Sequence, residues 1–298
     1  SVRLECLHHR SDDSADRRRL AVGVSVLLCH SGMIPAAETY DRWLAVTGTE
    51  AGLSPGRQLP DLPRRLQACF DGIRDPWLAL SRRIGASDAG ALTDTATGAA
   101  YINDFGLMLA WSELSRTLAD DKERSLIICD DPWLFRHLAL LPGVDAGKPP
   151  AIWPTATRLF LRGIASRLRL GLRLAHAAFT LKSTCRVAHS SRPAIVVYGH
   201  PQSDAEGNDA YFGPLMKELP QLGRALHTDC RIGRAREICR DGRSFSLHGW
   251  GSPIFAMFLV FVRWRPSRDL LETPEHWLLL RAAALENSGG ALAMTRWQ

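Results

Sequence analysis

A loop rich in acid–base side chains follows the β-branched run Ala194–Tyr198. Its candidates for proton transfer and substrate contact are His200, Asp204, Glu206, Asn208 and Asp209. Groups of these types can take the proton of a hydroxyl that attacks a substrate. His200 is the first candidate for the catalytic base, because an ordinary imidazole titrates near neutral pH, and Asp209 is the second. The alternative is a loop that is polar only because it faces solvent, and the sequence leaves that open.

Two adjacent carboxylates, Asp130 and Asp131, follow the short apolar run Ser125–Cys129. Proteins of the α/β class place ligand-binding groups beyond the carboxyl ends of their strands, so we expect both residues to contact substrate. A pair of carboxylates can also hold a divalent ion that bridges phosphates. The simpler alternative is that one Asp caps a helix beginning at Pro132, since Asp is a good cap and Pro suits the first turn. We therefore expect no metal.

Positive charge is concentrated in one stretch that contains no Asp or Glu. Its basic residues are Arg158, Arg162, Arg167, Arg169, Arg173, Lys182, Arg186 and Arg192. Leu159, Ile164, Leu168, Leu172 and Ala175 have helical spacing within Thr155–Lys182, so this part is predicted to be a basic helix. The helix can lie on an anionic membrane surface, with Arg158, Arg162, Arg167, Arg169 and Arg173 near the headgroups, or it can join two domains with its arginines in water. Gly163 and Gly171 are expected to weaken it.

Several classes of function are disfavoured by what the sequence lacks. It contains neither G-x-G-x-x-G nor a P-loop, so no nucleotide cofactor is expected. It also lacks a G-x-S-x-G elbow and an H-E-x-x-H pair. The net charge of +6 gives only an unspecific attraction for anions. Because no nucleic-acid-binding motif accompanies the arginines, a specific nucleic-acid partner is not expected.

The cysteines indicate a reducing, cytoplasmic location. The chain has 7 of them, an odd number, and no C-x-x-C pair, which favours reduced and mostly buried thiols. The segment Arg17–Cys29 resembles a signal peptide, but a buried strand or helix would show the same pattern. No apolar run reaches the length of about 20 residues that a membrane span needs, so any membrane contact is expected to be peripheral, at the inner membrane.

Periodicity and turn residues predict the elements that position these groups. Helices are expected over 62–73, 77–84, 105–114, 132–141, 155–182, 211–222 and 270–285, and strands over 125–129, 194–198 and 225–232. Loops are expected over Leu44–Leu62 and Gly85–Gly98, and Ser190–Pro193 is expected to be a linker. The apolar run Ile254–Val262 is interpreted as a buried helix or strand.

The fold class that follows is α/β. A mainly helical N-terminal region with a short parallel-sheet element (1–150) is expected to precede the basic helix and linker (151–193) and a Rossmann-like half (194–298). The chain begins with Ser1 and ends just after a helix-like stretch, so we expect a fragment whose last half is incomplete.

Two segments resemble bacterial surface-carbohydrate biosynthesis proteins thought to be sugar transferases. One combines Tyr101–Trp111 with Cys129–Phe135, and the other is Asn208–Leu215, where Asp209, Tyr211, Phe212, Gly213 and Leu215 match an Asp-x-Tyr-Phe-Gly-x-Leu pattern. The resemblance implies a GT-B-like arrangement, with a carbohydrate acceptor held by the earlier half and a nucleotide-sugar donor by the later one. It also implies that Asn208, Tyr211 and Gly213 contact substrate and that this fragment lacks much of the donor half.

The sequence therefore predicts a glycosyltransferase-like protein of surface-polysaccharide assembly. It would transfer sugar from a nucleotide sugar to a carbohydrate acceptor, with positive groups stabilising the leaving diphosphate. The alternative is a non-enzymatic scaffold or membrane-peripheral protein whose basic helix binds anionic lipid.

Overall fold

The computed structural model describes residues 25–50, 52–97, 104–181, 194–197, 199–227, 230–247 and 262–289. The expected linker Ser190–Pro193 and almost all of the run Ile254–Val262 lie outside these residues. The chain forms two compact units, and neither is a continuous segment. The first comprises 1–77 and 104–152, and the second comprises 78–103 and 153–298.

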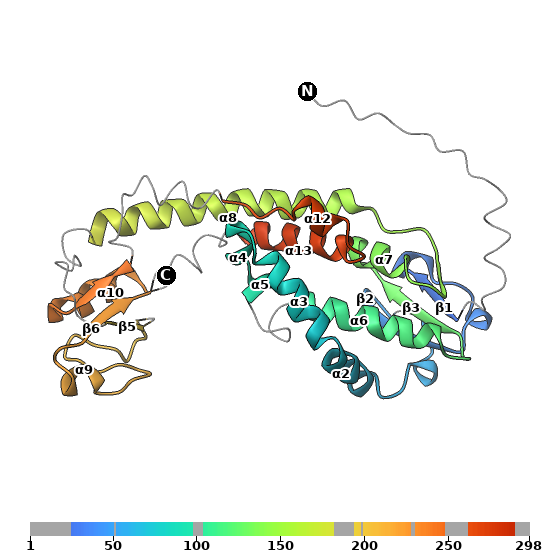
Figure 1. Ribbon diagram of the computed structural model, residues 1–298, viewed down its shortest axis with the longest axis horizontal. Helices are drawn as coiled ribbons and strands as arrows, with labels where there is room; N and C mark the ends of the chain where they lie inside the picture. The colour runs from blue at the N-terminus through green and yellow to red at the C-terminus, as the bar shows by residue number, and fades with distance from the viewer. Residues whose placement is uncertain are drawn as a thin grey trace, which may run out of the picture. The chain divides into compact units, whose positions relative to one another are not determined.

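The first unit is built on a parallel sheet of four strands, in the order β2-β3-β1-β4 (Figure 1). The strands are β1 (Val26–Cys29), β2 (Arg42–Thr47), β3 (Ser125–Cys129) and β4 (Val144–Ala146). Its helices are α2 (Leu62–Gly72), α6 (Asp104–Ala119) and α7 (Pro132–Leu138), with short 3-10 turns η2 (Ser31–Met33), η3 (Ala37–Thr39) and η4 (Pro55–Arg57). The mixed α/β class is confirmed.

Burial explains the strands of this sheet. All five residues of β3 are buried, as expected of an inner strand of a parallel sheet. On one face, Cys29, Trp43, Leu126 and Ile128 join Tyr40 in a hydrophobic cluster. The signal-like run Arg17–Cys29 thus ends in strand β1, in agreement with the interpretation of its pattern as a buried strand.

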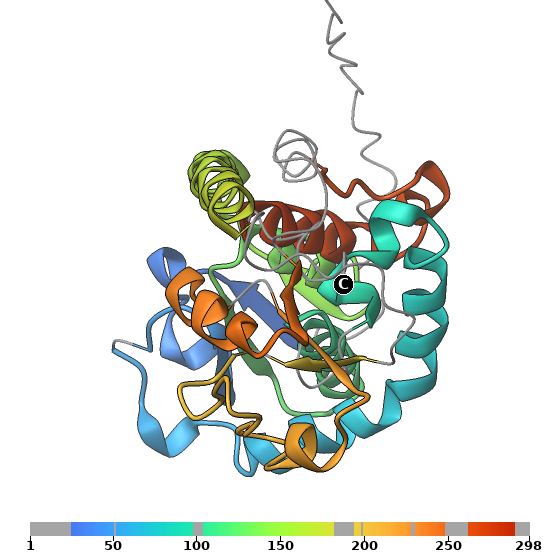
Figure 2. The same cartoon turned by 90° about the vertical axis from the view of Figure 1, so that its left-hand side faces the viewer.

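The second unit contains a long helix and a smaller sheet. Helix α8 (Ile152–Leu181) has 30 residues, of which all but the first belong to this unit, and α13 (His276–Gly289) packs against it (Figure 1 and Figure 2). A Cβ at Gly163 would lie 2.6 Å from the carbonyl oxygen of Asn287, so this glycine lets the two helices approach closely. The helix continues through Gly163 and Gly171.

Short elements complete the second unit. Three parallel strands form a sheet in the order β5-β6-β7. They are β5 (Ala194–Val197), β6 (Gly223–Leu226) and β7 (Ser244–Ser246), accompanied by α9 (Leu215–Glu218), α10 (Ile232–Ile238) and η5 (Cys239–Asp241). Helices α4 (Asp88–Ala91), α5 (Asp94–Thr97) and α12 (Arg268–Leu271) also belong here, while α3 (Arg74–Ile84) runs from the first unit into the second. Leu181, at the end of α8, enters the core of the small sheet with Val197 and Leu226.

The prediction of a helix over Tyr211–Leu222 was wrong. Only Leu215–Glu218 is helical. The backbone amides of Tyr211 and Phe212 donate to Asp209 Oδ1, at 2.9 and 3.3 Å, and Gly213 exchanges two backbone hydrogen bonds with Asp209. The two amide bonds to Asp209 are those of a helix cap, but Gly213 has a φ of 59°, outside the right-handed helical region, and its backbone bonds to Asp209 close a turn in place of a helix.

Other elements differ from prediction as well, and the expected loop Gly85–Gly98 contains the short helices α4 and α5. The expected loop Leu44–Leu62 begins too early, because β2 continues to Thr47 and buries Leu44 at its centre. The expected strand 225–232 begins at Gly223 and ends at Leu226, and Ile232 starts α10. The expected helix 270–285 is divided into α12 and α13, with Pro274 in the gap; a proline disfavours the helical conformation of the residue before it.

Candidate ligand site at the carboxyl edge of the first sheet

The loops that follow β1 and β3 are joined by the side chain of Asp130. Its Oδ1 accepts a hydrogen bond from the Ser31 backbone amide and its Oδ2 accepts one from Ser31 Oγ, both at 2.7 Å. Ser31 Oγ in turn accepts from the backbone amide of Thr49, beyond the end of β2, at 2.9 Å. One carboxylate and one hydroxyl thus connect the ends of three neighbouring strands, while Asp130 itself stays exposed to solvent.

Thr47 completes this polar edge from the end of β2. Its Oγ1 accepts hydrogen bonds from the backbone amides of Asp130, at 2.9 Å, and Asp131, at 3.0 Å. Between Thr47 and Thr49 lies Gly48, with a φ of 118° that favours glycine. We name the group formed by Ser31, Thr47, Thr49 and Asp130 the edge cluster. It is the kind of polar surface to which α/β proteins bind ligands, at the carboxyl ends of parallel strands.

Asp131 has the structural role that was the simpler alternative. Its Oδ1 accepts from the backbone amides of Trp133 and Leu134, both at 3.0 Å, and so caps α7. The two adjacent carboxylates therefore have different roles: Asp130 binds Ser31 at the edge of the sheet, and Asp131 caps α7. Among the described residues no group of three or more His, Cys, Asp or Glu side chains is arranged to hold a metal ion.

His30 lies beside the edge cluster and was not among the predicted site residues. It precedes Ser31, and its Nδ1 accepts a hydrogen bond from the Gly32 backbone amide at 3.1 Å. The sequence signal that could have found it is the triplet Cys29-His30-Ser31 at the end of an apolar run, the same pattern that drew attention to Asp130.

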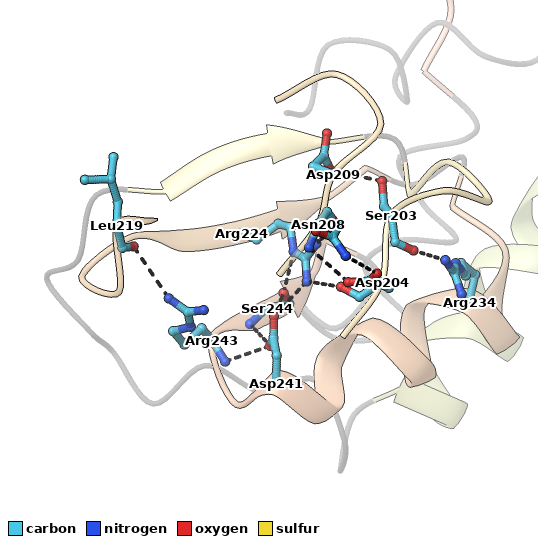
Figure 3. A network of polar contacts seen from close by, with 10 residues as sticks. All are labelled: Ser203, Asp204, Asn208, Asp209, Leu219, Arg224, Arg234, Asp241, Arg243 and Ser244. Carbon is cyan, nitrogen blue, oxygen red and sulfur yellow. Dashed lines mark hydrogen bonds and ion pairs between the residues drawn. The ribbon is translucent and has the colours of Figure 1, made fainter. Parts of the chain in front are cut away.

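The loop between β5 and β6 is held together by its own polar groups (Figure 3). Asp209 is only 4% exposed, and its carboxylate accepts from Ser203 Oγ at 3.0 Å as well as from the two amides that follow it. Asn208 donates from its backbone and side-chain nitrogens to the Asp204 carboxylate, at 2.9 and 2.6 Å. Asp209 and Asn208 thus shape the loop. These contacts favour a structural role for both.

His200 and Tyr211 are among the exposed members of this loop, as is Glu206. Their rings meet edge to face with centroids 6.2 Å apart, and Tyr211 is 69% exposed. Gly213 provides the turn described above, and no atom of the described residues lies within 4 Å of the position a Cβ would occupy. Of the two predicted bases, His200 is therefore the one that a dissolved substrate could reach.

A buried arginine underlies the same loop (Figure 3). Arg224 on β6 is fully buried, and its guanidinium donates to Ser244 Oγ, to the backbone oxygens of Asn208 and Asp204, and to Asp241 Oδ2 at 2.8 Å. The Asp241 side chain is 3% exposed. Because Asn208 and Asp204 belong to the loop and Ser244 begins β7, the arginine fixes the loop onto the sheet.

Helix α8 presents two exposed stripes. One is basic and consists of Arg158, Arg162, Arg169 and Arg173; the other is apolar and consists of Leu161, Ile164, Leu168, Leu172 and Phe179. At 3.6 residues per turn their centres lie about 100° apart around the helix axis. Arg167 departs from the expected headgroup position, because it is 2% exposed and donates to the carbonyl oxygen of Asn287. The helices of the described segments are all too short or too polar to cross a bilayer.

The described cysteines suit a packing role. Cys29, Cys129, Cys230 and Cys239 are buried, and Cys69 is partly buried. Burial, together with the negative charge of Asp130, raises the pKa of Cys29 to about 11. Burial likewise raises the pKa of Cys129 to about 12. Thiols with such values are not nucleophiles at neutral pH.

Fold and site together define a mixed α/β protein with two parallel sheets and a polar cluster at the carboxyl edge of the larger one. No protein-family model matches the chain. The comparisons likewise found no similar curated protein and no similar solved structure.

Proposed function

We propose that the chain is a glycosyltransferase-like protein and that the edge cluster holds its carbohydrate acceptor. The observation that carries this proposal is the exposed Asp130 carboxylate, fixed by Ser31 at the ends of three parallel strands. Carboxylates accept hydrogen bonds strongly, and sugars present hydroxyl donors. On this proposal the two sheets are the cores of two Rossmann-like halves, in keeping with the GT-B-like arrangement implied by the resemblance.

The proposed reaction is the attack of an acceptor hydroxyl on the anomeric carbon of a nucleotide sugar. A C–O bond to the sugar forms, the bond to the nucleoside diphosphate breaks, and a base takes the hydroxyl proton. Asp130 and the neighbouring His30 are the groups of the first unit with the right chemistry, and His200 is the exposed candidate of the second. Asp209 is less suited, since it is buried and bonded within its own loop.

Titration calorimetry with a panel of nucleotide sugars and oligosaccharides tests this function. We expect binding of at least one carbohydrate, weakened about tenfold or more by Asp130→Asn, since a hydrogen bond to a charged group contributes about 1.5–3 kcal/mol. Asp131→Asn is the matched control: it removes the adjacent charge, but asparagine still caps α7. Absence of binding across the panel, or equal effects of both substitutions, would contradict the proposal.

The exposed stripes of α8 favour a second function, peripheral binding to an anionic membrane. Apolar side chains beside arginines are the pattern by which a helix enters the headgroup region. The helix itself carries no Asp or Glu that would repel anionic lipid. This function is compatible with the first, because acceptors and donors of polysaccharide assembly can be lipid-linked.

Sedimentation with phosphatidylserine-containing vesicles tests the second function. Each arginine near an anionic surface contributes about 1 kcal/mol, so replacing Arg158, Arg162, Arg169 and Arg173 by Gln should weaken binding by two to three orders of magnitude. The matched control replaces four exposed arginines of other elements, namely Arg64, Arg82, Arg236 and Arg240, and lowers the net charge equally. If both sets weaken binding alike, only net charge matters and α8 has no special role.

A further inference from the structure

A cavity of about 410 Å³ lies beside α8 within the second unit. Its walls come from α8, from α13 and α12, and from residues 263–266. The apolar part of the lining includes Leu159, Phe160, Leu271 and Leu280, and the charged part consists of Arg167, Arg263 and Arg265. The size is within the range of small-molecule sites, roughly 300–1,000 Å³. Lining of this kind suits a molecule with an apolar body and a negative group.

Arg167 is the most unusual residue of this lining. It is 2% exposed, and among the described residues it has no carboxylate partner; its guanidinium bonds only to the backbone and side-chain oxygens of Asn287. Its Nε has no hydrogen-bond partner in that part of the chain. Burial, and then the positive charge of Arg263, lower the pKa of Arg167. A buried and unpaired charge is costly, and a nearby anion would offset that cost.

Two further contacts show that the charged end of the cavity is held in place. The Asn287 side chain accepts from the Trp264 backbone amide at 3.1 Å and donates to the Trp264 carbonyl oxygen at 2.8 Å. This fixes the segment that carries Arg263 and Arg265. The Arg263 guanidinium lies 5.4 Å from the centroid of the Phe160 ring, where the apolar and basic parts of the lining meet. Trp264 is 1% exposed, and its indole Nε1 has no partner among the described residues.

We infer that this cavity binds an amphipathic anion, with a carboxylate or phosphate head beside Arg263, Arg265 and Arg167 and an alkyl body against Leu159, Phe160 and Leu280. The inference goes beyond the proposed carbohydrate function, because the cavity belongs to the second unit and the edge cluster to the first. A sugar suits it poorly, since the apolar wall offers no hydrogen bonds to hydroxyl groups. The bound anion would supply the negative charge that the described residues do not place next to Arg167.

Calorimetry with four monomeric probes tests the two parts of the ligand separately. Octyl phosphate and octanoate carry both parts, inorganic phosphate carries only the head, and octanol carries only the body. We expect octyl phosphate or octanoate to bind at least tenfold more tightly than either single-part probe. If inorganic phosphate or octanol binds as well, or if no amphiphile binds, the inference is overturned.

Variants at exposed positions locate the binding without disturbing the core. Arg263→Gln with Arg265→Gln should weaken amphiphile binding about tenfold or more, because charge-assisted hydrogen bonds are lost. Arg268→Gln is the matched control, as this arginine is also exposed but does not line the cavity. Unchanged affinity in the double variant would refute the site. Asp130→Asn should leave amphiphile binding intact, so a failure of the carbohydrate proposal is distinguishable from a failure of this one.

Discussion

At the scale of the residue, Gly48 is the position on which the edge cluster depends most directly. A Cβ built there would lie 2.4 Å from Ser31 Oγ and 2.6 Å from Asp130 Oδ2, closer than such atoms ever approach. The glycine therefore gives the two groups the space in which they bond. Any side chain at this position must displace the carboxylate, the hydroxyl, or the loop that follows β2.

Gly48→Ala is accordingly expected to separate Ser31 from Asp130 and to lower the free energy of unfolding. A left-handed backbone conformation in a residue with a side chain costs about 1–3 kcal/mol, and the steric conflict adds to that. Gly52→Ala is the matched control, because Gly52 has a φ of 85° but no atom in the described part of the chain lies within 4 Å of its Cβ position. Urea unfolding of both variants measures the difference. Equal losses of stability would mean that the cluster tolerates the added methyl group.

The residues of the edge cluster were only partly accessible from the sequence. Asp130 was found, because a carboxylate after a fully apolar run indicates the end of a buried strand. Ser31 and Thr47 were missed, since their importance depends on β1 and β2 lying on either side of β3. That pairing brings together residues up to 99 positions apart in the chain. Short-range periodicity contains no information on such an order.

At the scale of the element, each sheet contains a buried arginine with the same pattern of hydrogen bonds and ion pairs. Arg42 on β2 donates from Nε to Ser125 Oγ at 2.8 Å, across from it on β3, and pairs with Asp121 and Glu123. In the second sheet, described above, Arg224 and Ser244 have the same register and distance. In each case a serine begins the neighbouring strand and an acid shortly before it receives the charge. The arginine thereby connects two parallel strands at their beginnings.

Loss of Asp241, the acid that pairs with Arg224, should destabilise the second sheet. Removing one partner of a buried ion pair leaves the other charge uncompensated, at a cost of about 3–5 kcal/mol, so Asp241→Ala is expected to lower the hydrogen-exchange protection of β6 strongly. Glu237→Ala is the control, because the Arg234–Glu237 pair is half exposed on the Glu side and should contribute less than about 1 kcal/mol. Similar protection in the two variants would show that Arg224 does not need its carboxylate.

Prediction of the elements succeeded where apolar periodicity was strong and failed where the backbone forms a local turn. The strand at 125–129 was predicted to the residue, and the ends of helix α8 were predicted to within three residues. The helix over 211–222 was not formed, because Gly213 takes a left-handed conformation and exchanges two backbone hydrogen bonds with Asp209, which closes a turn. Apolar spacing does not indicate such a turn.

At the scale of the whole molecule, residues 78–97 connect the two units in an unusual way. They follow most of the first unit in sequence but belong to the second. Glu286 on α13 accepts from the backbone amide and hydroxyl of Thr95, at 2.8 and 2.9 Å. A shortened chain that ends at residue 152 would therefore contain this segment without the helix to which it binds.

We expect limited proteolysis to detect this dependence. In the chain ending at residue 152, cleavage within 78–97 should be much faster than in the full chain, because the backbone opens where its packing partner is missing. Cleavage within the loop 52–58 serves as the control, since that loop belongs to the first unit in both chains. Equal cleavage of 78–97 in both chains would show that this segment folds without α13.

The hydrogen bonds between Thr95 and Glu286 can form only late in the synthesis of the chain. The two residues are 191 positions apart, and ribosomes add about 5–20 residues per second, so Thr95 waits about 10–40 s before its acceptor is made. After residue 146 the first sheet has all four of its strands, whereas Thr95 still lacks its acceptor on α13. Residues 78–97 of the nascent chain thus lack part of their packing until Glu286, near the end of the described residues, has been translated. A chaperone could recognise the segment during this time.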